Sequence, residues 1–290
     1  MTLNKSIEKR ISEALREDLA RMDITTKALI PKSQQGEALI LAREGGVLCG
    51  IAVAKRCFTL LDRDLQYEAR LKDGERFGPG TLLAAIRGRL CSILSAERVG
   101  MNLLARLSGI ATLTAAFVEK VKPYGTRIYD TRKTTPLWRE MEKYAVRMGG
   151  GWNHRFDLAG AYFIKDNHID ACGGMNQAMD RFFQAARLCR PIIVEARSCE
   201  EARIAADYPV DLLLLDNMSP GMIKRIVEKI KPRCDMEISG GIHLKNVECF
   251  ARTGIPRISI GALTHSAKSL DISLEYHHSN TLKLNAKKFN

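Results

Sequence analysis

Basic and hydrogen-bonding residues follow two short, strand-like segments near the middle of the sequence. The first segment, residues 126–129, is followed by Asp130, Thr131, Arg132 and Lys133, and the second, residues 161–164, by Lys165, Asp166, Asn167 and His168. Asn153, His154 and Arg155 lie between them. Several cations in one pocket bind a small ligand with carboxylates or phosphates, because desolvation strengthens each charge-assisted contact. One basic residue is more often part of a solvated face, but two clusters at strand ends favour an anion-binding site.

Two acidic residues end apolar runs later in the sequence. Glu195 ends the run PIIVE, and Asp216 ends the run LLLLD. Barrel enzymes carry their sites at the carboxyl ends of such strands, so both carboxylates are candidate catalytic groups. For Asp216 the alternative is a helix N-cap, because Ser219 and Pro220 begin a helix directly after it.

Glycine-containing turns are found at the ends of the last two strand-like segments. Their residues are Ser239, Gly240 and Gly241 in the first turn and Ser259, Ile260 and Gly261 in the second. Glycine lets backbone N–H groups approach an anion, and barrels often bind phosphate at these positions. The two turns therefore predict a phosphate site.

Metal ligation by histidine or cysteine is not indicated. His154 and His168 have no third histidine or paired acid at ligand spacing, so hydrogen-bonding roles are expected for them. The remaining histidines are interpreted as ordinary helix and loop residues: His243, His265, His277 and His278. The eight cysteines form no C-x-x-C pair, which argues against a zinc site and a disulfide framework.

Alternating strands and helices must position these side chains. After residue 125, six short apolar strands are separated by helices: 126–129, 161–164, 191–194, 212–215, 235–238 and 257–260. Such an alternation predicts parallel βα units that close into a barrel. Because only six strands are clear, the predicted fold class is α/β with an incomplete (β/α) barrel, residues 109–267.

A different pattern precedes the barrel. Residues 5–20 predict an amphipathic helix, residues 23–26 a turn, and the stretch from Gly36 to residue 88 strands with one helix. The N-terminal part, residues 1–108, is therefore predicted to be an α/β sandwich domain. Residues 91–121 are almost wholly helical in pattern, with breaks expected at Gly100 and Gly109, and a further helix is expected to open at Pro136.

The bulk properties narrow the class of protein. The chain has 290 residues, 46% of them hydrophobic, and a net charge of +12, which admits nucleic acid, an acidic membrane surface or a polyanionic small substrate. Only 6% of residues are aromatic and no basic-aromatic platform is present, which argues against nucleic acid as the main partner. No signal peptide or long apolar run is recognised, so no membrane association and a cytoplasmic location are expected.

Linked motifs identify a family. The segments DTRKTTP, EKYAV, GGGWNHR and IKDNH resemble quinolinate phosphoribosyltransferase, also called carboxylating nicotinate-nucleotide pyrophosphorylase. The resemblance extends nearly end to end through EDLARMDITTKALIP, AERVGMNLLARLSGIATLT, SGGI and ISIGALTHSAKSLDISL. Several motifs in family order form a specific signal. The chain departs from the family pattern at Met22, Val99, Gly100, Leu137, Asp157 and Gly160.

The resemblance implies an activity and an assembly. The expected reaction transfers the phosphoribosyl group of phosphoribosyl pyrophosphate to quinolinate, with loss of carbon dioxide and pyrophosphate, and gives nicotinate mononucleotide for NAD biosynthesis. The family has an open barrel packed under the sandwich domain of a second chain, and its residue matching Arg98 reaches the partner's active site. A homodimer with composite sites is therefore expected, with a hexamer as a larger alternative, and residues 268–290 are expected to join the sandwich domain.

The predicted site combines these residues. The expected catalytic groups are Lys133, Lys165, Glu195 and Asp216. The expected substrate-binding residues are Arg98, Thr131, Arg132, Lys133, His154, Arg155, Lys165, Glu195, Asp216, Ser239, Gly240, Gly241, Ser259, Ile260 and Gly261. Mg²⁺ is expected to accompany the donor, with Glu195 and Asp216 contacting it through water or substrate. No organic cofactor is expected, because the alkylated pyridine ring is itself an electron sink.

Three alternatives remain open from the sequence. A molybdate-associated paralogue of the same family would act on another substrate. A Schiff-base enzyme would use Lys165 as its nucleophile. A non-enzymatic anion-binding scaffold would not need two strand-end carboxylates among the cations.

Overall fold

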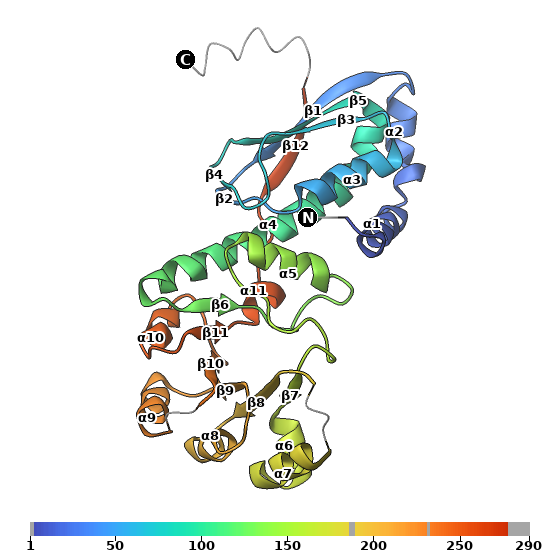
Figure 1. The fold of residues 1–290 in the computed structure, drawn as a ribbon. Coiled ribbons are helices and arrows are strands. Elements are labelled where there is room, and N and C mark those ends of the chain that lie inside the picture. The colour runs from blue at the N-terminus through green and yellow to red at the C-terminus, as the bar shows by residue number, and fades with distance from the viewer. Residues whose placement is uncertain (1–2, 186–188, 231–232, 278–290) are drawn as a thin grey trace. The chain divides into compact units, whose positions relative to one another are not determined.

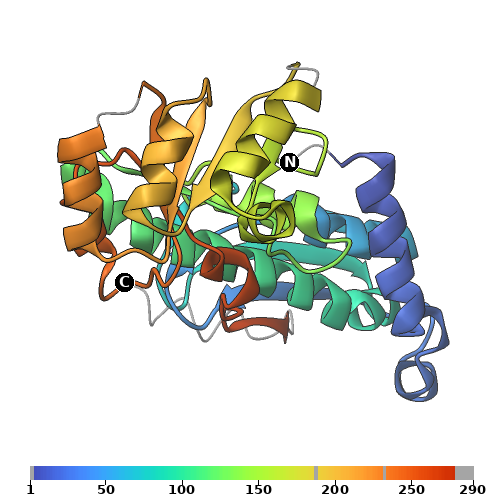
Figure 2. The same cartoon turned by 90° about the horizontal axis from the view of Figure 1, so that it is seen from below.

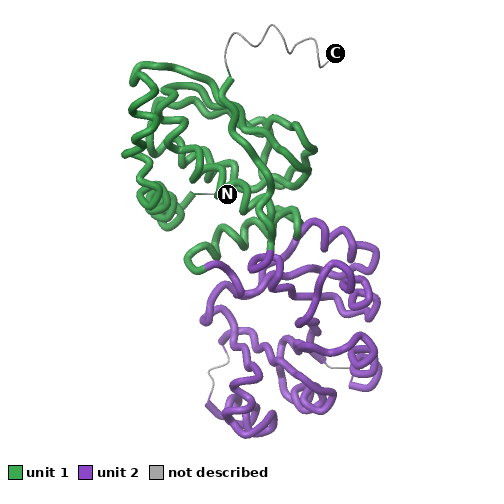
Figure 3. The backbone as a smooth tube through the Cα atoms, turned by 180° about the vertical axis from the view of Figure 1, so that it is seen from behind, with its two compact units in different colours: residues 1–113, 136–150, 267–290 green, residues 114–135, 151–266 purple. Residues whose placement is uncertain are grey.

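The computed structural model describes residues 3–185, 189–230 and 233–277, which group into two compact units. One unit comprises residues 1–113, 136–150 and 267–290, and the other residues 114–135 and 151–266 (Figure 3). Residues 136–150 were predicted to belong to the barrel domain, whereas the structure groups them with the first unit. The reason is a set of contacts to that unit: Tyr144 Oη donates to Asp73, and Arg106 pairs with Glu142 at 2.9 Å.

The first unit is built on a four-stranded antiparallel sheet in the order β12-β1-β5-β3 (Figure 1). Its strands are β1 (Gln35–Ala42), β2 (Gly46–Val47), β3 (Gln66–Ala69), β4 (Arg76–Phe77), β5 (Leu82–Arg89) and β12 (Ile272–His277). Its helices are α1 (Lys5–Glu17), η1 (Ala20–Met22), α2 (Ile24–Leu29), α3 (Ile51–Leu61), α5 (Arg139–Met148) and the first part of α4 (Leu90–Val121). Strand β12 pairs with β1, so residues 272–277 do join this domain, whereas 278–290, with His278, lie outside the described residues.

The core of this unit lies between the sheet and its helices. Ile40 of β1 and Ile86 of β5 are fully buried against Phe58 of α3 and Leu104 of α4. Side chains alternate across a strand, so one face of β1 supplies Ala38, Ile40 and Ala42 to this core. An α/β sandwich domain is thus present, as the sequence predicted.

Two glycines predicted to break α4 do not do so, because α4 is continuous over 32 residues. A Cβ atom at Gly109 would lie 2.0 Å from the carbonyl oxygen of Lys268, and one at Gly100 would lie 2.9 Å from the ring of Phe58. Both glycines therefore permit close packing. Residues 90–124 also satisfy the length and composition of a membrane-crossing helix, but 61% of the relevant window is buried, as in a core helix.

Two local predictions differ from the structure. Asp23 does not form a simple turn but caps α2, since its Oδ1 accepts from the Thr26 amide at 2.9 Å. Helix α5 begins at Arg139 rather than Pro136 because Leu137 has a left-handed backbone (φ 67°), which an α-helix cannot accommodate.

The second unit contains a six-stranded parallel sheet in the order β6-β11-β10-β9-β8-β7. Its strands are β6 (Arg127–Tyr129), β7 (Tyr162–Ile164), β8 (Ile192–Ala196), β9 (Leu212–Asp216), β10 (Asp235–Ser239) and β11 (Arg257–Ser259). Besides the last part of α4, its helices are η2 (Lys122–Tyr124), α6 (Asp166–Cys172), α7 (Met175–Ala185), α8 (Cys199–Ala206), α9 (Pro220–Ile230), α10 (Val247–Ala251) and α11 (Ala262–His265). Helices α7, α8 and α9 lie along the outside of this sheet (Figures 1 and 2). The incomplete barrel is confirmed, because β6 and β7 end the sheet without pairing to each other.

Candidate active site

A pocket of about 630 Å³ opens at the carboxyl ends of the barrel strands. Fourteen of the fifteen residues predicted to bind substrate line it: Thr131, Arg132, Lys133, His154, Arg155, Lys165, Glu195, Asp216, Ser239, Gly240, Gly241, Ser259, Ile260 and Gly261. All fourteen belong to the second unit. The pocket brings them together because the carboxyl ends of parallel strands meet at one edge of a sheet.

Cationic side chains line one part of the pocket around the ring of Phe163. The Arg155 guanidinium carbon lies 4.9 Å from the ring centroid, and Lys165 Nζ lies 4.6 Å from it. Arg155 also donates from Nη1 to the Ala161 carbonyl at 2.9 Å. Burial and then the positive charge of Arg132 lower the pKa of Arg155 from its ordinary value. An anionic ligand between these cations would offset their repulsion, so the site is suited to a carboxylate or phosphate.

The loop after β6 is held by its own polar groups. The Lys133 amide donates to Thr131 Oγ1 at 3.0 Å, and Thr264 Oγ1 donates to the Lys133 carbonyl at 2.7 Å. A Cβ atom at Gly261 would lie 2.9 Å from Lys133 Cδ, so this glycine leaves room for the lysine side chain. The loop is therefore tied to the segment that follows β11.

The turn after β10 depends on glycine. Gly240 has a φ of 88°, and a Cβ atom there would lie 2.3 Å from Asn217 Oδ1. Gly241 also has positive φ. The two residues let the backbone turn closely over the pocket beside Ser239, as an anion-binding turn requires.

Glu195 is the penultimate residue of β8, and Asp216 is the last residue of the neighbouring strand β9. Burial raises the pKa of Glu195 above its ordinary value, the negative charge of Asp216 raises it further, and Lys165 opposes both. Asp216 is not the N-cap of α9: the Ser219 hydroxyl accepts from the Met222 amide at 3.3 Å and takes that position. The two carboxylates thus form an anionic edge that would stabilise a positive centre.

His154 sits at the floor of the pocket. Its Nδ1 accepts from the Arg155 amide at 2.8 Å, and its Nε2 lies 3.6 Å from Glu237 Oε1. Its ring stacks on Phe163 with the centroids 5.7 Å apart. Asp130 supports the segment by accepting from the His154 amide at 2.8 Å and from Asn153 at 2.6 Å. Both ring nitrogens face protein groups, and a direct contact of His154 with substrate stays a prediction.

Arg98 is the one predicted site residue that does not line this pocket. It belongs to the first unit, its side chain is 68% exposed, and it lies 3.8 Å from Glu97. An exposed pair at that distance adds little stability. A contact of Arg98 with substrate stays a prediction.

The predicted substrate-binding set omits six lining residues, of which Asp166 had been placed only in the polar cluster after residues 161–164: Phe163, Asp166, Leu214, Ile242, Ala262 and His265. Phe163 and Leu214 precede Lys165 and Asp216 by two residues, so the two-residue period of a strand could have identified them. His265 was interpreted as an ordinary helix or loop residue, but it lines the pocket one turn after Gly261. The one-turn spacing from Gly261 could have identified His265 from the sequence.

Two departures from the family pattern lie in the loop that follows Arg155. Asp157 Oδ1 accepts from the amides of Ala159 and Gly160, each at 2.9 Å. A Cβ atom at Gly160 would come no closer than 3.6 Å to Asp157 Oδ1, so glycine is not required by space. Asp157 therefore folds the loop, while the Arg155 guanidinium bonds the Ala161 carbonyl.

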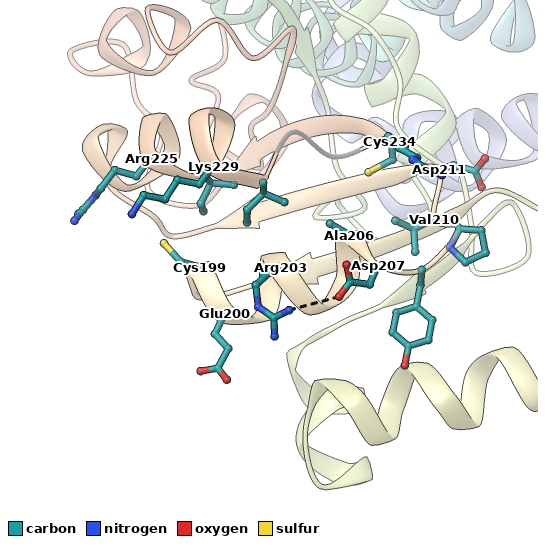
Figure 4. Close-up of a pocket in the computed structure, with 15 residues that line it drawn as sticks. Cys199, Glu200, Arg203, Ala206, Asp207, Val210, Asp211, Arg225, Lys229 and Cys234 are labelled. Atoms are coloured by element: carbon teal, nitrogen blue, oxygen red, sulfur yellow. Dashed lines mark ion pairs between the residues drawn. The ribbon is translucent and has the colours of Figure 1, made fainter.

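A larger groove, of about 1220 Å³, lies between α8 and α9 (Figure 4). Its polar lining includes Arg203 and Asp207, which pair at 3.5 Å, and Arg225 and Lys229. None of the predicted site residues lines this groove. The smaller pocket is the candidate active site because it alone gathers them among the described pockets.

No group of three or more histidine, cysteine or acidic side chains that could hold a metal ion exists among the described residues. Glu195 and Asp216 are still a pair of hard oxygen donors whose mutual repulsion a divalent cation would relieve. Two carboxylates suit Mg²⁺, which commonly keeps several waters and is completed by substrate phosphates.

Comparisons with known proteins cover almost the whole chain. Residues 23–108 match the quinolinate phosphoribosyl transferase N-terminal domain, and residues 110–275 match the C-terminal domain of the same family. The chain is 40% identical over 274 residues to a probable carboxylating nicotinate-nucleotide pyrophosphorylase of Bacillus subtilis, covering 94% of each protein. It is 40% identical to the decarboxylating quinolinate phosphoribosyltransferase 2b of Nicotiana tabacum, with 90% of this chain and 80% of that protein covered. The crystal structure of NadC from Streptococcus pyogenes is 41% identical, covers 96% of this chain and all of its own, and has a TM-score of 0.89.

Proposed function

Because this chain belongs to the quinolinate phosphoribosyltransferase family, we propose that it transfers a phosphoribosyl group from phosphoribosyl pyrophosphate to the pyridine nitrogen of quinolinate. The products are nicotinate mononucleotide, pyrophosphate and carbon dioxide, and the reaction serves NAD biosynthesis. The observation that carries the proposal is one pocket with a cationic part, a pair of carboxylates and two glycine-containing turns. The cationic part suits quinolinate, and the carboxylates and the two turns suit phosphoribosyl pyrophosphate.

The cations bind the dicarboxylate. Arg132 and Arg155 present planar guanidinium groups that can each bind a carboxylate through two parallel hydrogen bonds. Lys133 and Lys165 add point charges from the ends of β6 and β7. The ring of Phe163 gives the pyridine an apolar surface beside them.

The rest of the pocket serves the phosphoribosyl donor. Backbone amides of residues 239–241 and 259–261 hold its phosphate groups, as glycine-containing turns do in other barrels. When the bond from ribose to pyrophosphate breaks, positive charge develops on the ribose. Glu195 and Asp216 stabilise that charge and accept hydrogen bonds from the ribose hydroxyls. Lys133 and Lys165 help to neutralise the departing pyrophosphate.

Mg²⁺ accompanies the donor in this proposal, and Glu195 and Asp216 are the residues that would hold it through water or through the substrate. When bound, the ion neutralises the pyrophosphate leaving group. The chain's own residues do the remaining work of orientation and charge stabilisation.

Decarboxylation follows from the first step. Bond formation to the ring nitrogen gives it a positive charge, which stabilises the electron pair left on the adjacent carbon when carbon dioxide departs. That carbon then takes a proton. No organic cofactor enters this scheme.

A homodimer with composite sites completes the proposal. Arg98 lies in the first unit with its side chain exposed on α4, and in the family the matching residue reaches the active site of the partner subunit. The support for this arrangement is the family's assembly, and the same reasoning leaves a hexamer as a larger form. A cytoplasmic location is expected for the enzyme.

Product analysis tests the proposal directly. Purified protein incubated with quinolinate, phosphoribosyl pyrophosphate and Mg²⁺ should form nicotinate mononucleotide and release one carbon dioxide for each molecule. Omission of the donor is the control. Absence of product at any practical enzyme concentration would overturn the proposal and favour the molybdate-associated paralogue. A borohydride-trapped adduct on Lys165 would favour the Schiff-base alternative.

A further inference from the structure

A buried carboxylate lies under the pocket and has no part in the proposed chemistry. Glu237, in the middle of β10, has no exposed surface. Its Oε2 accepts from Arg257 Nε at 2.9 Å, and it also accepts a hydrogen bond from Ser259. The other carboxylate oxygen, Oε1, makes no hydrogen bond to the described residues and faces His154 Nε2 at 3.6 Å.

The hydrogen bond at the other ring nitrogen fixes the proton on His154. Nδ1 accepts from the Arg155 amide, so in a neutral ring the proton must be on Nε2. This N–H faces Glu237 Oε1, an oxygen that can accept from it. Arg257 supplies the compensating charge, and its guanidinium carbon lies 4.0 Å from the Tyr129 ring centroid. At 3.6 Å the contact with His154 is electrostatic and would become a hydrogen bond with a small shift, as apo-site contacts do when substrate binds.

We propose that Glu237 is a positioning residue that acts through His154 to orient the substrate clamp. Glu237 holds the ring with Nε2–H inward, His154 thereby fixes the Arg155 backbone through Nδ1, and its face supports Phe163. Phe163 in turn lies under the cationic groups of Arg155 and Lys165. The inference rests on the proposed function insofar as the clamped ligand is quinolinate.

Burial explains why this carboxylate is sensitive to its partners. Desolvation raises the pKa of Glu237 above its ordinary value, while Arg257 and Ser259 oppose that rise and Asp130 adds to it. Among the described residues, the charged or titratable groups recorded beside it are Arg257, Asp130 and His154. A buried acid so placed is costly unless it is paired.

Glu237→Gln tests the proposal, because it keeps the size of the side chain and removes its charge. We expect the KM for quinolinate to rise about 10-fold, while the KM for phosphoribosyl pyrophosphate changes less than about twofold. In a His154→Asn background, where an amide oxygen can still accept from Arg155, the same change should have less than about a twofold effect. Equal rises in both KM values, or a full effect without His154, would show a purely structural role and overturn the proposal.

Glu142→Gln is the matched control. Glu142 is equally buried and pairs with Arg106 at the same 2.9 Å, but it lies in the first unit. This control should lower the melting temperature and leave the quinolinate KM unchanged. If Glu237→Gln does not fold, Glu237→Asp keeps the charge and retracts it from His154 by one methylene. A rise in the quinolinate KM is still expected, and no rise would overturn the proposal.

Nitrogen NMR of ¹⁵N-histidine-labelled enzyme gives a result that does not depend on activity. The His154 signals, assigned with the His154→Asn variant, should show a protonated Nε2 and a bare Nδ1 in the wild type. A proton on Nδ1 would overturn the proposal even in an active enzyme. If instead the wild type makes no nicotinate mononucleotide but shows the expected tautomer, the proposed function fails and the positioning role stands.

Discussion

Glu195→Gln should separate the chemical step from substrate binding. Glu195 is only 8% exposed, at the end of β8, and it is the carboxylate whose pKa is raised by burial and by Asp216. The change to glutamine keeps the shape and most of the hydrogen-bonding capacity. It removes one negative charge close to the expected position of the ribose.

The size of the effect follows from Coulomb's law. A unit charge about 5 Å from the developing positive centre contributes roughly 3 kcal/mol at an effective dielectric constant of about 20. That energy corresponds to a fall in kcat of about 10²-fold. Quinolinate carries negative charge itself, so its affinity should be unchanged or slightly higher once Glu195 is neutral.

Steady-state kinetics with varied donor and Mg²⁺ would measure kcat, and isothermal titration with quinolinate would measure binding. The pH profile gives a second test, because only the ionised Glu195 can stabilise the ribose. The wild-type kcat should fall as pH decreases through the Glu195 pKa, which lies above the ordinary glutamate value, and this limb should vanish in the glutamine variant. Glu200→Gln, an exposed acid on α8, is the control and should change neither quantity. A variant at position 195 with normal kcat and weakened quinolinate binding would refute the assignment of this carboxylate to the donor.

Four further outcomes are expected. Glu195→Gln should raise the melting temperature. Folding raises the pKa of Glu195, so the folded protein loses stability as pH rises through that pKa, and a glutamine amide avoids this loss. A lower melting temperature in the variant would contradict this expectation. Arg132→Lys and Arg155→Lys should each lower kcat/KM for quinolinate by an amount equivalent to about 2 to 4 kcal/mol of transition-state binding, since an ammonium cannot bind a carboxylate bidentately. Full kcat/KM in both variants would show that the two arginines do not clamp the substrate. Inactive Arg98→Ala and Lys133→Ala subunits, refolded together or co-expressed, should recover activity in the hybrid, and verified hybrids that stay inactive while wild-type controls recover would exclude a shared site. Gly109→Ala should lower the free energy of unfolding, measured by urea denaturation, by about 2 kcal/mol, because the new Cβ atom would meet the Lys268 carbonyl and this clash outweighs the helix propensity of alanine. Gly221→Ala in α9 is the control, and it should not destabilise the protein because there is open space around that glycine.

The pattern of the sequence was sufficient to predict most of the second unit. Each barrel strand is a short apolar run, and the polar residues that follow it mark the edge where the pocket forms. Arg132, Lys165, Glu195 and Asp216 could therefore be assigned to one pocket from their positions alone. The two-residue period of a strand would also have added Phe163, had it been applied to the residues before the strand ends.

Other features depend on contacts between segments far apart in the chain. Gly109 looked like a helix break, and only the approach of residue 268 reveals why a glycine is needed there. Leu137 ends the run before α5 through a left-handed backbone that leucine rarely adopts, so its residue type gave the wrong helix start. Glu237 pairs with Arg257 across β10 and β11, and no local pattern predicts a buried ion pair between neighbouring strands.

The open side of the barrel explains where the substrate clamp is located. Strand β6 has no strand neighbour on its outer edge, but Trp152 forms a single parallel bridge there: its amide donates to the Ile128 carbonyl at 2.8 Å and its carbonyl accepts from the Asp130 amide at 3.0 Å. The segment then leaves the edge, and Asp130 turns it inward by holding Asn153 and the His154 amide. A complete strand would have to alternate its side chains between the inside and the outside of the barrel. One bridge is enough to anchor the chain, and the irregular backbone beyond it can direct His154 and the adjacent Arg155 into the same pocket. The absence of a full strand at this edge of the described sheet thus provides the position from which Arg155 enters the site.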